Sequence, residues 1–264
     1  MHFRFAGLSV EEVVGTSDQA KRECLLQWCG RLQAGPSDCL LPPTDLLRAL
    51  VFAHRTNSPS FDWKTVDARA VEFERGIQRR KVILSPQLSS KAREEQAILQ
   101  KQVRHVFTQM RPEIQTLFEA NRVTPPDTFR EAVAQGSGNN AMGMWEKWVL
   151  GKCKILYDGF GETEASEGVV AEFLEACPPF RAYVYGMLMQ EYDRAIKPKN
   201  TGQRFKAGYN DLAMSVYLPY CDKFVTAEKK GEQEKCLREI VGVANLNTDI
   251  LSYDIFCDSF LVKI

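Results

Sequence analysis

The segment from 208 to 228, GYNDLAMSVYLPYCDKFVTAE, arranges acidic residues around a short apolar run. Asp211 lies near its start, Asp222 follows the apolar run, and Glu228 lies just beyond the sequence KFVT. Because KFVT combines β-branched and aromatic residues, it predicts a brief β-strand with Glu228 past its carboxyl end. Sites in α/β sheets form outside the carboxyl ends of the strands. The segment therefore predicts an acidic site at one edge of a sheet.

Outside a long central region, the sequence alternates between strand patterns and helix patterns. Apolar residues predict strands over 39–41 and 249–253, and helical spacing predicts helices over 18–32 and 236–241. A further helix is expected to begin at 42–45, PPTD, because proline is favoured in a first helical turn. This alternation is typical of the α/β class.

A long central region interrupts the alternation. Between 57 and 158 the sequence predicts mainly helices, over 67–80 and 89–120, with Pro112 marking a kink or break in the second. Such a region exceeds an ordinary connecting loop. We expect one domain over 1–264 that contains a helical insertion or cap at 57–158, a flexible joint at 136–140 and a C-terminal core at 164–264.

The C-terminal pattern resembles the last part of a PIN-like domain, a nuclease fold in which acids hold Mg²⁺ or Mn²⁺ for cutting RNA. The matching features are Asp211, the tract YLPYCD at 217–222, the strand ending FVT at 224–226, and Glu228. The resemblance implies a three-layer α/β core with a small parallel sheet and a hydrolase like the toxins and RNA-processing enzymes of that group. It implies that Asp211 binds the metal directly and that Glu228 does so directly or through water. Asp222 would support these ligands or the fold.

The N-terminal part departs from the PIN-like pattern. These nucleases open with a strand ending in Asp-x-Asn, whereas Ala6 and Gly7 follow the corresponding apolar residues here. The place of a second family acid, after Pro43, is taken by Arg48. The remaining candidates are Asp45, one helical turn before Arg48, and the acids that follow the opening strand, which are Glu11 and Glu12.

Two functions are compatible with this pattern. One is a weak or degenerate Mg²⁺- or Mn²⁺-dependent endoribonuclease, which an Asp-x-Asn strand encoded upstream of Met1 would favour. The other is a catalytically silent module that binds RNA or a protein partner. A plainer interpretation of the acids also remains, in which Asp211 caps a helix, Asp222 caps a strand and Glu228 is solvated.

Charge is unevenly distributed along the chain. Basic residues outnumber acids between 64 and 104, whereas the segment from 158 to 175 holds acids and no base. One interpretation is a basic surface that grips an RNA backbone while the acidic segment faces it or holds metal, and the other is ordinary solvated helix faces. The total of 34 basic and 34 acidic residues disfavours a general nucleic-acid coat. The candidate RNA contacts are Arg79, Arg80, Lys197, Lys199 and Arg204.

Other classes of site and location find little support. No apolar stretch is long enough to span a membrane, and the first residues lack the pattern of a signal peptide, so we expect a cytoplasmic protein with no membrane contact. The eight cysteines form no CxxC pair, which disfavours zinc. No glycine-rich phosphate loop occurs. The sequence leaves the RNA target, the partner and the oligomeric state open.

Overall fold

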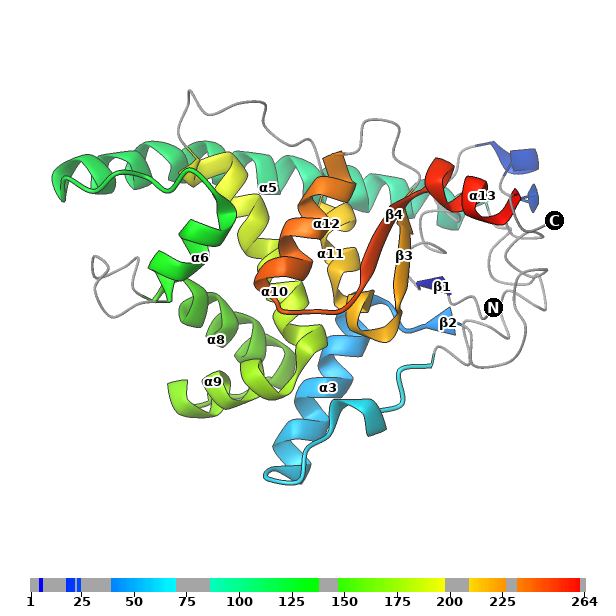
Figure 1. The fold of residues 1–264 in the computed structure, drawn as a ribbon, viewed down its shortest axis with the longest axis horizontal. Coiled ribbons are helices and arrows are strands. Elements are labelled where there is room, and N and C mark those ends of the chain that lie inside the picture. Colours follow the sequence, from blue (N-terminus) through cyan, green and yellow to red (C-terminus); the bar gives the residue numbers. More distant parts are fainter. Residues whose placement is uncertain are drawn as a thin grey trace. The chain divides into compact units, whose positions relative to one another are not determined.

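The computed structural model describes residues 5–6, 18–21, 23–24, 39–69, 86–137, 147–197, 209–226 and 232–261 (Figure 1). The chain divides into two compact units, 1–103 and 104–264. The described residues are mainly helical and include two pairs of parallel strands. The broad α/β class is therefore confirmed, whereas a PIN-like core and an insertion at 57–158 stay predictions.

In the first unit a strand pair leads into a buried helix. Strand β1 (Phe5–Ala6) is parallel to β2 (Cys39–Leu40), with Phe5 paired to Cys39. Helix α3 (Pro43–Asn57) follows β2 with proline in its first turn, as the sequence predicts. Its buried face is formed by four apolar side chains with no exposed surface, Leu46, Leu47, Leu50 and Val51. A 3-10 turn, η1 (Trp63–Thr65), comes next.

The start of the helix predicted over 67–80 is wrong. Residues 67–69 are not helical, because the backbone there pairs with the end of β2. Leu41 donates its N–H to the carbonyl of Ala68 at 2.9 Å, and Leu40 forms an antiparallel bridge with Arg69. Residues 70–80 lie outside the described part. In the helix predicted over 18–32, residues 19–21 and 23–24 are helical and 25–32 are not described.

The helix predicted over 89–120 is present as α5 (Pro86–Ala120), but Pro112 does not break it. Proline removes one N–H and leaves the rest of the ladder available, and Pro112 itself is exposed. Its carbonyl accepts a hydrogen bond from the Thr116 hydroxyl at 2.9 Å. Helix α6 (Phe129–Gly136) then begins with a capping box and ends in the buried Gly136, the first residue of the predicted joint.

The second unit is built around a buried helix. Helices α8 (Trp148–Gly161) and α9 (Glu167–Ala176) pack against α10 (Pro178–Glu191), which continues as the π-helix η2 (Tyr192–Ile196). Almost every side chain of α10 is buried, as expected for a helix that is apolar all round. Aromatic rings join the three helices, with Phe173 centred 5.1 Å from Tyr157 and 4.8 Å from Phe180.

The chain then forms a parallel strand pair joined by a helix (Figure 1). Helix α11 (Tyr209–Ala213) and the 3-10 helix η3 (Met214–Tyr220) precede strand β3 (Lys223–Thr226). Helix α12 (Glu232–Val243) connects β3 to β4 (Asp249–Ser252), and α13 (Tyr253–Leu261) follows. Both predicted strands and the helix between them are confirmed. Tyr253 differs from the prediction because it opens α13 rather than ending β4.

Candidate acidic site

Asp211 is held beside the carboxyl end of β3. Its backbone carbonyl accepts a hydrogen bond from Nε2 of Gln233, in the first turn of α12, at 3.4 Å. The other end of the same amide, Oε1 of Gln233, accepts from the hydroxyl of Thr226 at 2.6 Å. Thr226 is the last residue of β3 and is 4% exposed. The half-buried Asp211 therefore lies near the sheet edge where the sequence predicts the site.

Helix α10 provides a close-packed support for α11. A Cβ added to Gly186 would lie 2.5 Å from the Leu212 carbonyl oxygen and 2.6 Å from Oγ of Ser215, so only glycine fits without movement. The Ser215 hydroxyl lies 2.9 Å from the carbonyl oxygen of Ala182 and 2.6 Å from that of Leu212. Since Leu212 follows Asp211 directly, this contact fixes the backbone that carries the candidate ligand.

Asp222 lies at the opposite end of β3. It is exposed and precedes the strand, and its carbonyl accepts a hydrogen bond from the N–H of Asp249 at 2.8 Å. A rise of about 3.3 Å per residue puts it roughly 13 Å along the strand from Thr226. This position suits an acid that supports the fold better than one that shares a metal with Asp211.

Asp45 occupies the first turn of α3, in the first unit. Its carboxylate lies 3.6 Å from the guanidinium of Arg48, and both side chains are more than half exposed. An exposed pair of this kind contributes little to stability. It does place a cation beside the candidate ligand, which opposes the binding of a metal ion there.

Several predicted site residues lie outside the described part of the chain, namely Glu11, Glu12, Arg79, Arg80, Lys199, Arg204 and Glu228. Lys197 is described and half-buried, and its carbonyl accepts from Arg111 at 3.1 Å. Its positive charge acts on Glu239. Partial desolvation raises the pKa of Glu239 above its usual value, Lys197 opposes that rise, and Asp193 adds to it. Lys197 therefore has an acidic neighbour besides any phosphate.

Among the described residues, no group of three or more His, Cys, Asp or Glu side chains is placed to hold a metal ion. Mg²⁺ does not require such a group, since it keeps several waters and is commonly held by one or two carboxylates. The backbone of Asp211 is connected through Gln233 to Thr226, the last residue of β3. The segment that follows Thr226 carries the second candidate, Glu228.

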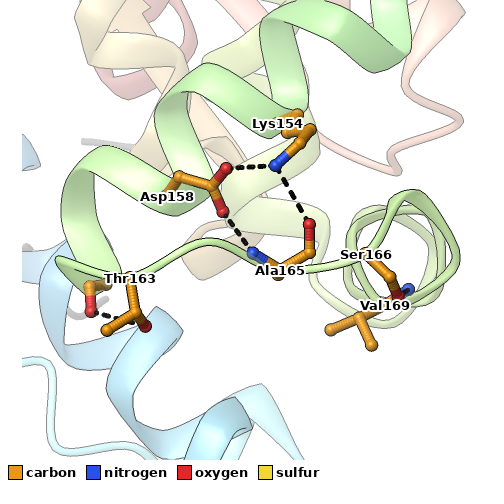
Figure 2. Close-up of polar contacts among 7 residues, drawn as sticks. Lys154, Asp158, Thr163, Ala165, Ser166 and Val169 are labelled. Carbon is orange, nitrogen blue, oxygen red and sulfur yellow. Dashed lines mark hydrogen bonds and ion pairs between the residues drawn. The ribbon is translucent and has the colours of Figure 1, made fainter.

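The acidic run from 158 to 175 has a structural explanation (Figure 2). Asp158 accepts hydrogen bonds from Nζ of Lys154 and from the N–H of Ala165, and Lys154 also donates to the Ala165 carbonyl at 3.0 Å. These contacts close the turn between α8 and α9. Glu167 pairs with Lys147 at 3.0 Å. The arrangement favours the interpretation as solvated and capped helix ends over a metal-binding or RNA-facing surface.

Sequence reasoning missed a buried charged contact between α8 and α10. Glu191 is 7% exposed, and its carboxylate accepts from Nε1 of Trp148 at 2.8 Å and from Nζ of Lys152. For the contact of Glu191 with Trp148 and Lys152, the only signal in the sequence was the alternation of apolar and polar residues in α8. Gln233 and Gly186 were also missed. A glycine inside an apolar helix is a recognised sign of close packing, whereas a glutamine in a first helical turn carries no signal.

Comparison with known proteins gives no relative for this chain, since no family model, curated protein or solved structure matches it. Among the described helices, none combines the length and the apolar character needed to cross a membrane.

Proposed function

We propose that the chain is a PIN-like protein with weak Mg²⁺- or Mn²⁺-dependent endoribonuclease activity, centred on Asp211 and Glu228. The observation that supports it best is the hydrogen-bonded connection from Asp211 through Gln233 to Thr226, at the carboxyl end of a parallel strand pair. That edge is where α/β folds place their sites. Glu228 follows Thr226 by two residues in the sequence.

The chain's own residues would provide oxygen ligands and contacts to phosphate. A divalent ion bound at this edge lowers the pKa of a water and neutralises charge on the scissile phosphate. Asp211 would provide one carboxylate from α11, which packs against α10, and the basic residues Lys197, Lys199 and Arg204 precede it in the sequence. The activity is weak because Ala6, Gly7 and Arg48 replace acids of the PIN-like pattern. Fewer carboxylates lower both metal affinity and the activation of water.

The test is cleavage of single-stranded and structured RNA by the purified chain in Mn²⁺ or Mg²⁺. We expect slow cleavage that EDTA stops and that Asp211→Asn abolishes. Asp222→Asn is the matched control, because it removes a carboxylate from the opposite end of β3, and it should cleave at the wild-type rate. Cleavage that survives Asp211→Asn would contradict the proposal and indicate a contaminant or another site.

The second candidate is a catalytically silent module that binds RNA or a protein partner, and the Asp45–Arg48 ion pair favours it. A carboxylate already facing a guanidinium is a poor metal ligand. If the basic segment at 64–104 binds RNA, replacing Arg79 and Arg80 with Glu will weaken binding and reduce its dependence on salt. An unchanged affinity and salt slope would assign these arginines to a solvated face.

A further inference from the structure

The buried helix of the second unit ends in a π-helical turn. Helix α10 continues as η2, and the N–H of Lys197 bonds to the carbonyl of Tyr192, five residues back, at 2.8 Å. An α-helix would pair the same N–H with the carbonyl of Asp193. π-helical turns are rare, and many occur at functional positions. A π turn at this place therefore needs a stabilising contact that an α turn would lack.

Two side chains of α5 provide that contact, because they donate to four consecutive carbonyls at 194–197. The two terminal nitrogens of Arg111 reach the first and the last of these carbonyls, at 2.8 and 3.1 Å. Nε2 of Gln115 donates to the two carbonyls between them, at 3.2 Å each. The last carbonyls of a helix have no partner within the helix, and most residues of η2 are buried. The side chains of α5 therefore cap this helix end in place of water.

Other contacts hold η2 at the same face of α5 and at its own beginning. Phe107 lies four residues before Arg111 and so shares its face of the helix. The Arg194 guanidinium carbon lies 5.6 Å from the centroid of the Phe107 ring, which makes a cation–π contact. At the start of η2, the Tyr192 hydroxyl donates to the carbonyl of Asp127 at 2.5 Å. The beginning of the turn is thus fixed independently of its end.

We propose that Arg111 and Gln115 form a latch that holds the end of η2 in the π register, and that without this latch the helix end rewinds to the α register. Rewinding turns each successive carbonyl further from its present direction, so the two side chains could no longer reach all four carbonyls. The positive charge of Arg111 also suits the negative end of the helix dipole, but both registers have that dipole. Geometry rather than charge therefore selects the π register. The latch is independent of the proposed function.

The register also decides where the charge of Lys197 lies. Partial desolvation raises the pKa of Glu239 on α12, Lys197 lowers it and Asp193 raises it. Because Tyr192 is fixed, rewinding displaces Lys197 more than Asp193, which follows Tyr192 directly. Release of the latch should therefore remove the cation from Glu239 and leave the neighbouring acid, so the pKa of Glu239 should rise further.

The experiment determines the acceptor of the Lys197 N–H in the full chain carrying both Arg111→Met and Gln115→Leu. These substitutions keep side-chain bulk and remove all four hydrogen bonds. A crystal structure, or NMR coupling across the hydrogen bond, identifies the acceptor. We expect it to shift by one residue, from Tyr192 to Asp193. A double variant in which Lys197 still bonds to Tyr192 would overturn the proposal, whatever its stability, because the two side chains would then only stabilise a register set by η2 itself.

A milder variant keeps the test decisive if the first one fails to fold. Arg111→Lys with Gln115→Leu retains a cation at the helix end but lacks the planar fork that spans the carbonyls, so it should also adopt the α register. Retention of the π register in this variant would show that charge alone holds the turn and would likewise overturn the proposal. Gln109→Leu is the matched control, at an exposed position on the same helix, and it should keep the π register and the wild-type pKa of Glu239.

Discussion

Replacing Gly186 with alanine tests the packing that supports the Asp211 helix. The new Cβ would meet the Leu212 carbonyl oxygen at 2.5 Å and Oγ of Ser215 at 2.6 Å, both closer than such contacts occur. The carbonyl cannot rotate away, and the hydroxyl is held between the carbonyls of Leu212 and Ala182. Overpacking costs about 1–3 kcal/mol. Loss of the hydroxyl's hydrogen bonding adds about 1 kcal/mol, and the better helix propensity of alanine offsets about 1 kcal/mol. The expected net destabilisation is about 2 kcal/mol.

Urea denaturation followed by circular dichroism measures this loss as a lower midpoint at an unchanged slope. Gly159→Ala on α8 is the matched control, because no atom lies within 4 Å of the added Cβ, and it should stabilise the chain by up to about 1 kcal/mol. Ser215→Ala combined with Gly186→Ala should recover only part of the loss, since the Leu212 carbonyl still blocks the methyl group. A Gly186→Ala protein as stable as Gly159→Ala would refute the close approach of α10 and α11.

Three further predictions concern charge and thiol chemistry. Lys152→Met leaves the buried Glu191 carboxylate without its cation and should lower the free energy of unfolding in urea by about 2 kcal/mol, less than for a fully buried pair because the Lys152 side chain is 26% exposed. Adding Glu191→Gln, which still accepts from Trp148, should recover most of that loss, and failure to recover would contradict the pairing. The pKa of Glu239 is raised in the folded state, so its stabilising contribution is complete below pH 4.5, the usual pKa, and is lost as the pH rises through the higher folded pKa. Between pH 4 and 8 the urea midpoint of the wild type should therefore fall more than that of Glu239→Gln, and parallel pH profiles would count against the shift. Burial raises the pKa of Cys153 and Cys177 to about 12, which leaves about one thiol in ten thousand ionised at pH 8. Mass spectrometry after brief iodoacetamide treatment should find the exposed Cys24 modified and the two buried cysteines unmodified, and equal labelling of all three would show that the buried thiols are accessible.

The parts of the fold that were predicted correctly are those that local sequence determines. The strand KFVT, the strand at 249–252 and the leucine-rich face of α3 each follow from residue type and period within a few positions. The start of the predicted 67–80 helix failed because Ala68 and Arg69 pair with the end of β2, far away in the sequence. Propensity is a weak guide where tertiary pairing competes with it.

The candidate site was predictable only in part, for the same physical reason. The pattern around Asp211 and the strand end at Thr226 indicates which edge of the sheet matters. The contact that brings them together crosses 22 residues to Gln233, whose sequence context is that of any polar residue on a helix surface. The position of Gly186 against Leu212 likewise depends on how α10 and α11 cross, and the sequence of neither helix determines that crossing by itself.

The location of the metal tests the central claim most directly. Crystals of the full chain grown with Mn²⁺ would show the ion by its anomalous scattering, without assuming any ligand. We predict an ion about 2 Å from a carboxylate oxygen of Asp211, with Glu228 as a direct or water-mediated ligand. An ion bound elsewhere, or carboxyl groups of Asp211 and Glu228 more than roughly 12 Å apart, would contradict the account.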